Sequence, residues 1–83
     1  MTVNDAVASR VLHLMYDRNM TQYRLEQITG IAHGAMDRIL SGTNKTVTLT
    51  TCYKFAVAFN LTINEFFDDP VFSIDNISID SLY

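Results

Sequence analysis

The sequence has one cysteine, Cys52, and no tryptophan. A single cysteine makes no disulfide within the chain, and no partner residues stand around Cys52 at the spacing of metal ligands. We therefore expect no metal site, and we expect Cys52 to be a small core residue.

Long apolar runs are also missing. No segment approaches the roughly 20 apolar residues that a membrane-spanning helix needs. The first residues, MTVNDAVASR, do not combine a basic region with a continuous apolar stretch, as a secretory signal would. These absences predict a cytoplasmic protein with no membrane partner.

Groupings typical of catalysis are absent as well. His13 and His33 fall in different predicted helices, and the sequence shows no paired carboxylates, nucleophile elbow or phosphate-cradling loop. We expect no catalytic residues, no cofactor and no small-molecule ligand, so the protein is not expected to be an enzyme. The 83 residues, of which 48% are hydrophobic, suffice for the core of one small domain.

Basic residues are few and unevenly placed. The chain has 6 Lys and Arg against 9 Asp and Glu, a net charge of −3. All six basic residues lie within residues 1–64 beside only four acidic ones, so that this part carries +2 and the rest carries −5. The average charge argues against a nucleic-acid partner, but a polyanion meets the local surface rather than the average.

Residues 21–42, TQYRLEQITGIAHGAMDRILSG, predict two short helices around one glycine. Thr21 is a good N-cap, and Leu25 and Ile28 recur at helical spacing, so we expect the first helix to bury both and to end at Gly30. Gly30 suits the left-handed turn residue, and Ile31 is the apolar plug that follows.

The second helix of this segment is expected from about residue 32 to Gly42. Its apolar stripe consists of Ala35, Met36, Ile39 and Leu40. Its outward residues would be His33, Gly34, Asp37 and Arg38. Two helices joined by a tight glycine turn present the second one to a major groove, so the spacing favours DNA binding.

The flanking segments predict three more helices and a tail. A helix over about residues 4–18 has the stripe Val7, Val11, Leu14 and Met15, capped by Thr2 or Asn4. After a polar loop at 43–47, Thr48 caps a helix that carries Leu49, Cys52, Tyr53, Ala56 and Phe59. Thr62 and Glu65 form a capping box for a short helix that ends before Pro70. The tail, VFSIDNISIDSLY, is too apolar for a disordered linker, and its alternation suits a short strand or an extended arm.

In this order the elements resemble the Cro/repressor-type (XRE-type) helix-turn-helix family of bacterial and phage transcription regulators, over about residues 5–67. The matching residues are Met20-Thr21-Gln22, Leu25, Thr29-Gly30-Ile31, Arg38-Ile39, Gly42, Leu49, Ala56, Leu61-Thr62-Ile63 and Glu65-Phe66-Phe67. The ending at residues 66–72 looks like that of a small subgroup from Gram-positive bacteria and their mobile elements. The resemblance implies an all-α, five-helix, lambda-repressor-like domain over residues 1–69, with a short extended C-terminal arm over residues 70–83.

Three features depart from the family pattern. Glu26 stands where a small residue is usual, so either its carboxylate turns to solvent or the two helices of the motif lie slightly apart. Met15 and Leu40 replace the common Arg–Glu pair, an exchange that leaves no buried charge alone. Residues 32–35, Ala-His-Gly-Ala, offer few side chains that read base edges.

The resemblance also implies which residues meet DNA. Gln22 would brace the recognition helix and donate to a phosphate, or remain a solvated residue of the first turn. Lys45 would contact the DNA backbone from its loop, or remain a solvated loop residue. Asp37 would accept from cytosine or remain merely solvated or repulsive, and Arg38 is a phosphate contact, a guanine contact or a surface charge. The full predicted set is Gln22, Tyr23, His33, Gly34, Asp37, Arg38, Asn44, Lys45 and Thr46.

We therefore expect a transcription regulator, with repression as its expected role, that binds a palindromic operator in double-stranded DNA as a homodimer. The alternative is a protein-interaction module with the same fold and no DNA affinity, such as an antirepressor or an antitoxin-like partner. Dimerisation is assigned to Phe72, Ile74, Ile77 and Ile79 of the arm. In the alternative arrangement, Phe72 and Ile74 fold back on their own chain and cover the fifth and first helices.

Overall fold

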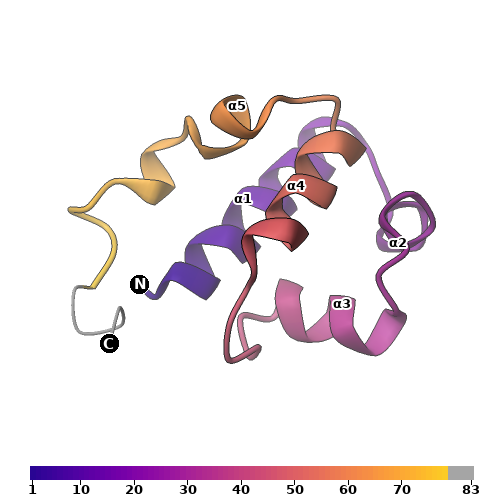
Figure 1. Cartoon of the computed structure of the whole chain (residues 1–83), viewed down its shortest axis with the longest axis horizontal. Coiled ribbons are helices and arrows are strands. Elements are labelled where there is room, and N and C mark those ends of the chain that lie inside the picture. The colour runs from indigo at the N-terminus through magenta and orange to yellow at the C-terminus, as the bar shows by residue number, and fades with distance from the viewer. Residues whose placement is uncertain (79–83) are drawn as a thin grey trace.

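The computed structural model describes residues 1–78 of the chain. These residues form five α-helices and one short 3-10 helix, with no strand among them (Figure 1). The elements are α1 (Val3–Asp17), α2 (Gln22–Thr29), α3 (His33–Leu40), α4 (Leu49–Ala58), α5 (Ile63–Phe67) and η1 (Pro70–Phe72). The helix α3 packs against α1 and α2, and α4 packs against α2 and α5. The predicted all-α architecture with five helices is confirmed.

Threonine begins four of the five α-helices. The hydroxyls of Thr2, Thr21, Thr48 and Thr62 each accept a hydrogen bond from the backbone N–H three residues later, which satisfies a donor that the helix itself leaves free. Asp5 and Glu65 complete capping boxes by accepting from the backbone N–H of Thr2 and Thr62. These hydrogen bonds lower the pKa of both carboxyl groups. Thr2, rather than Asn4, is therefore the cap of α1.

The core lies where the five α-helices meet. Its buried members are Val7, Val11, Leu14, Leu25, Met36, Ile39, Cys52, Phe55, Ala56, Phe59 and Phe66. Cys52 is among them as predicted, and burial raises the pKa of its thiol. Met15 and Leu40 both pack partly buried against this core. No helix within residues 1–78 is long and apolar enough to cross a membrane.

Three residues predicted to lie on buried helix faces are exposed instead. Ile28 is 40% exposed, Leu49 is 62% exposed and Tyr53 is 49% exposed. The buried face of α4 follows Cys52, Ala56 and the two phenylalanines at positions 55 and 59, which turns Leu49 and Tyr53 outward. Ile28 and Tyr53 then border a shallow groove between α2 and α4, together with Thr29, Thr50, Lys54 and Val57.

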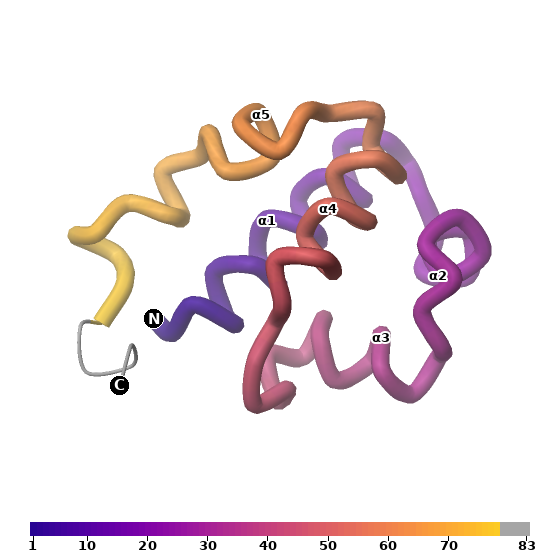
Figure 2. Tube along the Cα trace, viewed as in Figure 1, coloured from indigo at the N-terminus to yellow at the C-terminus, as the bar shows by residue number. Residues whose placement is uncertain are grey.

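The C-terminal segment is not an extended arm over residues 70–78. Pro70 opens η1, where the Asp69 side chain accepts from the backbone N–H of Val71. Turns follow, and the chain returns to the N-terminus (Figure 2). There the backbone N–H of Ser78 donates to Met1 O at 2.9 Å. Within residues 70–78, η1 packs against α1 and the turns that follow it replace an extended conformation. The alternation that suggested a strand is at residues 77–80, of which Ile79 and Asp80 lie outside the described residues.

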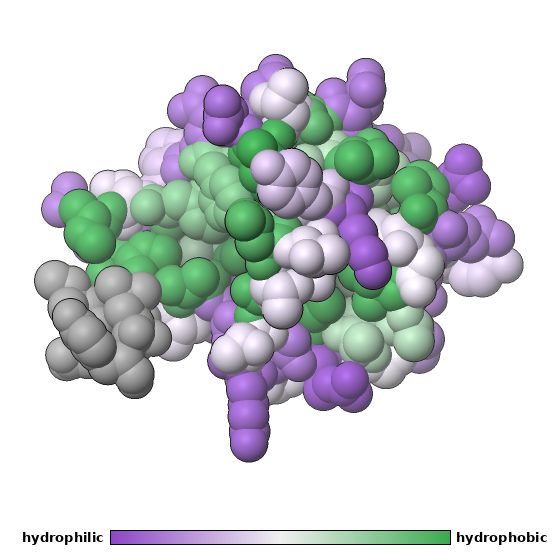
Figure 3. All heavy atoms as spheres, viewed as in Figure 1, coloured by the Kyte–Doolittle hydropathy of each residue, from purple (hydrophilic) through white to green (hydrophobic). Residues whose placement is uncertain are grey.

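Phe72 packs on its own chain. Its ring centroid lies 6.1 Å from that of Phe66 and 4.9 Å from that of Phe67. Ile74, in contrast, is exposed, and Ile77 is half-buried. The alternative in which the segment folds back therefore describes Phe72 but not Ile74, and Ile79 lies outside the described residues. Figure 3 shows hydrophobic side chains exposed at the end of the molecule where this segment meets the N-terminus.

Candidate nucleic-acid interface

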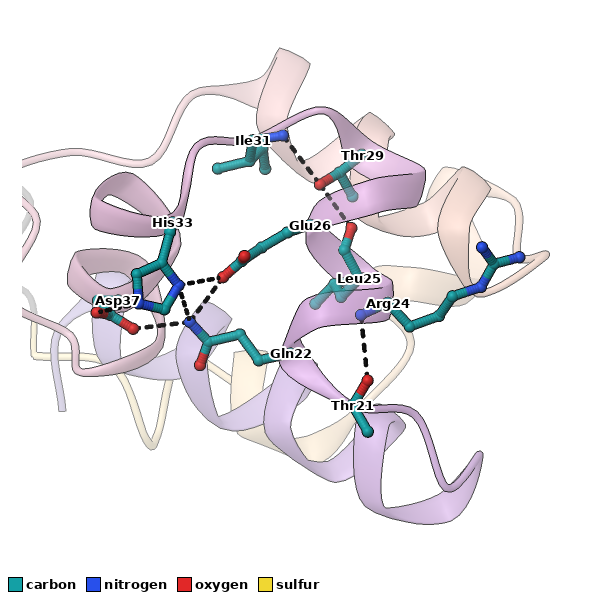
Figure 4. Close-up of polar contacts among 9 residues, drawn as sticks. All are labelled: Thr21, Gln22, Arg24, Leu25, Glu26, Thr29, Ile31, His33 and Asp37. Atoms are coloured by element: carbon teal, nitrogen blue, oxygen red, sulfur yellow. Dashed lines mark hydrogen bonds and ion pairs between the residues drawn. The ribbon is translucent and has the colours of Figure 1, made fainter.

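The turn between α2 and α3 is built from local hydrogen bonds. Gly30 ends α2 in the left-handed conformation, with φ 73°, and its N–H donates to Glu26 O. Thr29 Oγ1 donates to Leu25 O at 2.8 Å and accepts from Ile31 N at 3.2 Å (Figure 4). Ile31 packs against the core, as the predicted plug should. The glycine thus sets the angle at which α3 leaves α2.

The helix α3 shows two distinct faces. Met36 and Ile39 are buried and fix the helix to the core, whereas Ala35 and Leu40 are half-buried. His33, Gly34, Asp37 and Arg38 are exposed, as the sequence predicts for the outward face. An added Cβ at Gly34 would meet only Arg38 Nη1, at 3.7 Å, so this part of the helix surface is open.

Four polar side chains join α2 to α3 at this face, and we call Gln22, Glu26, His33 and Asp37 the bridge cluster (Figure 4). Gln22 Nε2 donates to Glu26 Oε2 at 2.9 Å and to Asp37 Oδ1 at 2.7 Å. His33 Nδ1 lies 2.8 Å from Glu26 Oε2, and His33 Nε2 lies 3.4 Å from Asp37 Oδ2. Gln22 therefore braces α3 by holding Asp37.

The carboxylate of Glu26 does not turn to solvent, which was the first of the two predicted alternatives. Its side chain is only 14% exposed, and its carboxylate points toward α3 (Figure 4). The helices α2 and α3 are in contact, and Glu26 spans the space between them. Two hydrogen bonds lower the pKa of Glu26. The bond from Gln22 has the larger effect, and the bond from His33 has the smaller one. Sequence reasoning missed this bridge, although the i,i+4 pairs Gln22–Glu26 and His33–Asp37 were a visible signal.

His33 is the most exposed member of the bridge cluster, with 73% of its side chain exposed. The hydrogen bond to Glu26 raises the pKa of the imidazole, and the charges of Asp37 and Glu26 raise it further. The two carboxylates thus favour the imidazolium form.

The loop from residue 43 to 47 supplies the other predicted contacts. Asn44 Nδ2 donates to Thr46 O at 2.6 Å, and Asn44 O accepts from Asn4 Nδ2 at 2.5 Å, so Asn44 shapes the loop and ties it to α1. Lys45 and Thr46 are exposed. They border an open hollow whose lining residues also include Thr2, Val3, Asn4, Gly42 and Val47.

Two of the six basic side chains, those of Arg10 and Arg18, form hydrogen bonds within the fold. Arg10 donates to Phe66 O, Glu65 O and Asp69, and Arg18 Nη1 donates to Phe59 O. Arg38 and Lys45 are the exposed basic residues of α3 and of the loop that follows it. The negative charges of Glu26 and Asp37 offset their positive charges on this face. The charge of +2 over residues 1–64 therefore overstates how positive this face is. Tyr23 is exposed, and its hydroxyl accepts from Gln27 Nε2 at 3.1 Å.

The structure brings most of the predicted contact residues to α3 or to the segments directly before and after it. Gln22 reaches α3 by its side chain, whereas the loop residues follow α3 along the chain. Among residues 1–78 no group of three His, Cys, Asp or Glu side chains is placed to hold a metal ion.

Comparison with known proteins agrees with this arrangement. A family model described as the Cro/C1-type HTH DNA-binding domain matches residues 10–70. No curated protein and no solved structure matches the chain. The match includes all of α2 to α5, and with them the glycine turn and the outward face of α3. The chain belongs to the Cro/C1-type helix-turn-helix DNA-binding domain family.

Proposed function

We propose that this protein is a sequence-specific transcription regulator, acting as a repressor, that inserts α3 into the major groove of double-stranded DNA. The observation that carries this proposal is the division of α3 into a buried face and an open face. Met36 and Ile39 fix the helix to the core, and His33, Gly34, Asp37 and Arg38 on its other side are exposed. A helix held in this way after a tight turn has the arrangement that enters a major groove.

Within this proposal the predicted residues have different roles. Gln22 and Tyr23 lie in the first turn of α2, where backbone N–H groups favour a phosphate. Asp37 suits an amino group of cytosine, and Arg38 suits guanine or a phosphate. Lys45 and Thr46 follow the DNA backbone from the loop, and Gly34 allows a close approach to the groove.

The regulator is further proposed to act as a homodimer on a palindromic operator. A two-fold dimer places two recognition helices about 34 Å apart, one turn of DNA. The C-terminal segment over residues 70–83 is the proposed dimerisation element beside the domain over residues 1–69. Ile74 and Met1, both exposed, lie on the two segments that meet at this end of the molecule. The resemblance of residues 66–72 to small Gram-positive regulators supports a bacterial or phage origin.

One observation favours a second function. Glu26 and Asp37 stand beside the open face of α3, and Arg10 and Arg18 donate to other parts of the fold instead. A face with this balance of charge attracts phosphates less than a basic one does. The second candidate is therefore a protein-interaction module with the same fold, such as an antirepressor or an antitoxin-like partner.

A selection from random duplex DNA, followed by mobility shifts across a salt series, separates the two functions. A DNA-binding regulator enriches a sequence, and the logarithm of its binding constant falls linearly with the logarithm of salt concentration, by about 0.9 for each phosphate contact. The double variant Arg38→Ala with Lys45→Ala is the matched control, and it should lose this binding while remaining folded. Failure to enrich any sequence at low salt would favour the protein-interaction module.

A further inference from the structure

The His33 imidazole lies between two carboxylates, one from each helix of the motif. Its Nδ1 faces Glu26 of α2 at 2.8 Å, and its Nε2 faces Asp37 of α3 at 3.4 Å. A neutral imidazole has only one N–H, so one ring nitrogen would direct its lone pair at a carboxylate. An imidazolium hydrogen-bonds Glu26 through Nδ1 and forms a longer ion pair with Asp37 through Nε2, so neither carboxylate faces a lone pair. The geometry of the ring therefore fits the protonated form.

Gln22 strengthens this assignment because its amide has no hydrogen left for the ring. Its two N–H groups donate to Glu26 and to Asp37, at 2.9 Å and 2.7 Å. Gln22 Nε2 also lies 3.5 Å from His33 Nδ1, but it has no N–H left to donate to that nitrogen. Turning the amide over would place its oxygen against both carboxylates. The orientation of Gln22 is therefore fixed by the same two acids that hold His33.

The proton changes the charge of the face that is proposed to meet DNA. With neutral His33 the bridge cluster carries two negative charges, and with the imidazolium it carries one. A polyanion is repelled less by the protonated cluster, and the Nε2–H, which lies 3.4 Å from Asp37 Oδ2 in a long ion pair, is a donor that a phosphate or a guanine edge can share. The charged groups that face the ring are Glu26 and Asp37, and the cation of α3, Arg38, lies one turn from Gly34, the residue after His33.

We propose that this protein binds DNA with His33 protonated, and that Glu26 is the positioning residue that holds the proton on the recognition helix. At pH values at which the imidazole of the free protein is neutral, binding is then coupled to the uptake of a proton, and the affinity for the operator rises as the pH falls. This inference rests on the proposed DNA-binding function. Glu26 is mostly buried behind His33, so it acts through the imidazole rather than by touching a base. Its lowered pKa keeps it a carboxylate throughout the range in which histidine titrates.

The test measures the affinity for the selected duplex by fluorescence anisotropy, from about pH 5.5 to about pH 8 at constant ionic strength, the range in which histidine changes its charge. Uptake of one proton predicts that the binding constant of the unmodified protein falls with rising pH by up to about tenfold per unit. His33→Gln should give a flat profile. Glu26→Gln retains an acceptor for His33 but not its charge, and should move the midpoint to lower pH. His13→Gln, which alters the other histidine, should leave the profile unchanged.

A proton NMR titration of the imidazole signals supplies a readout that needs no DNA. The spectrum of His13→Gln assigns the His33 signal, and its midpoint should fall in Glu26→Gln and rise when the duplex is added. A midpoint that Glu26→Gln does not move would overturn the positioning role. A flat affinity profile for the unmodified protein would overturn the proton coupling and leave the DNA-binding proposal intact, whereas absence of DNA binding at every pH would defeat both proposals.

Discussion

Arg10 Nε of α1 donates a hydrogen bond of 2.7 Å to the carbonyl oxygen of Phe66 in the last turn of α5. The same guanidinium donates to Glu65 O at 2.9 Å and to Asp69 Oδ2 at 3.1 Å. Carbonyl groups at the end of a helix lack the usual partners of the helix, and one side chain donates to two of them, of which Glu65 O also accepts from Asp68 N at 3.2 Å. Arg10 thereby joins the first helix to the C-terminal part of the fold.

Replacing Arg10 should therefore destabilise the protein. We expect Arg10→Ala to lower the free energy of unfolding by about 2 to 4 kcal/mol, because hydrogen bonds to a charged group are worth about 1.5 to 3 kcal/mol each but are not additive within one network. Arg10→Lys should recover only part of this, because an ammonium group does not reproduce the planar fork. Asp69→Asn keeps the acceptor for Val71 N and should cost at most about 1 kcal/mol. Urea unfolding measures all three, and an Arg10→Ala protein as stable as the unmodified one would contradict the assignment.

The glycines at positions 30 and 42 form a matched pair for a second prediction. Both are in the left-handed conformation, with φ values of 73° and 74°. An added Cβ meets nothing within 4 Å at Gly30, but at Gly42 it would lie 2.6 Å from Asp5 Oδ1. Gly30→Ala should therefore cost only the backbone strain of about 1 to 2 kcal/mol. Gly42→Ala should cost a further 1 to 3 kcal/mol or so, the usual cost of an atom forced into filled space.

A double-mutant cycle checks the cause of that difference. In an Asp5→Ala background the side chain that meets the new Cβ is gone, so Gly42→Ala should cost about as much as Gly30→Ala. Thermal unfolding followed by circular dichroism gives the four stabilities. Equal costs for the two glycines in the unmodified protein would show that Asp5 does not restrict Gly42.

Local signals predicted the elements well, and long-range contacts account for the errors. Thr21, Thr48, Thr62 and Gly30 act within one turn of chain, so their roles as caps and as turn residue were readable from the sequence. The buried face of α4 could not be predicted from the sequence, because it depends on how α4 packs against α5. Phe55 stacks on Phe66 with ring centroids 6.4 Å apart, and no local pattern shows this contact.

The tail and the bridge cluster illustrate the same limit. The sequence did not show that Phe72 contacts Phe66 and Phe67, because this contact depends on how η1 packs beside α5. The outward face of α3 followed directly from helical periodicity. The bridge between Glu26 and His33 crosses a turn of left-handed backbone, so its distance depends on how α2 and α3 are angled rather than on sequence spacing.

The phosphate role of Lys45 can be tested against another exposed lysine. Lys45 lies in the loop after α3, whereas Lys54 lines the groove between α2 and α4. Lys45→Ala should weaken binding to all sequences alike and reduce the salt slope by about one, since one phosphate contact is lost. Lys54→Ala should leave the slope unchanged. Filter-binding isotherms over a salt series measure both slopes, and an equal loss in the two variants would count against a specific role for Lys45.

Arg38 should behave differently from Lys45 if it reads a base. We expect Arg38→Ala to weaken binding to the selected operator by about 1 to 3 kcal/mol and to relax the preference at one position of the site. Competition between the selected duplex and its single-base variants measures that preference. A uniform loss for every duplex would identify Arg38 as a phosphate contact.

The C-terminal segment offers two neighbouring apolar residues with opposite expected behaviour. Phe72 packs against Phe66 and Phe67 of its own chain, so Phe72→Ala should lower the stability of the monomer by about 1 to 3 kcal/mol, less than a fully buried phenylalanine would cost. Ile74 is 63% exposed beside the N-terminal segment, and on the proposed dimer it would be covered by the partner. Ile74→Asp should therefore make the protein monomeric in light scattering while its monomer stability stays nearly unchanged. An unmodified protein that is monomeric at micromolar concentration, or an Ile74→Asp variant that remains fully dimeric, would remove this segment from the interface.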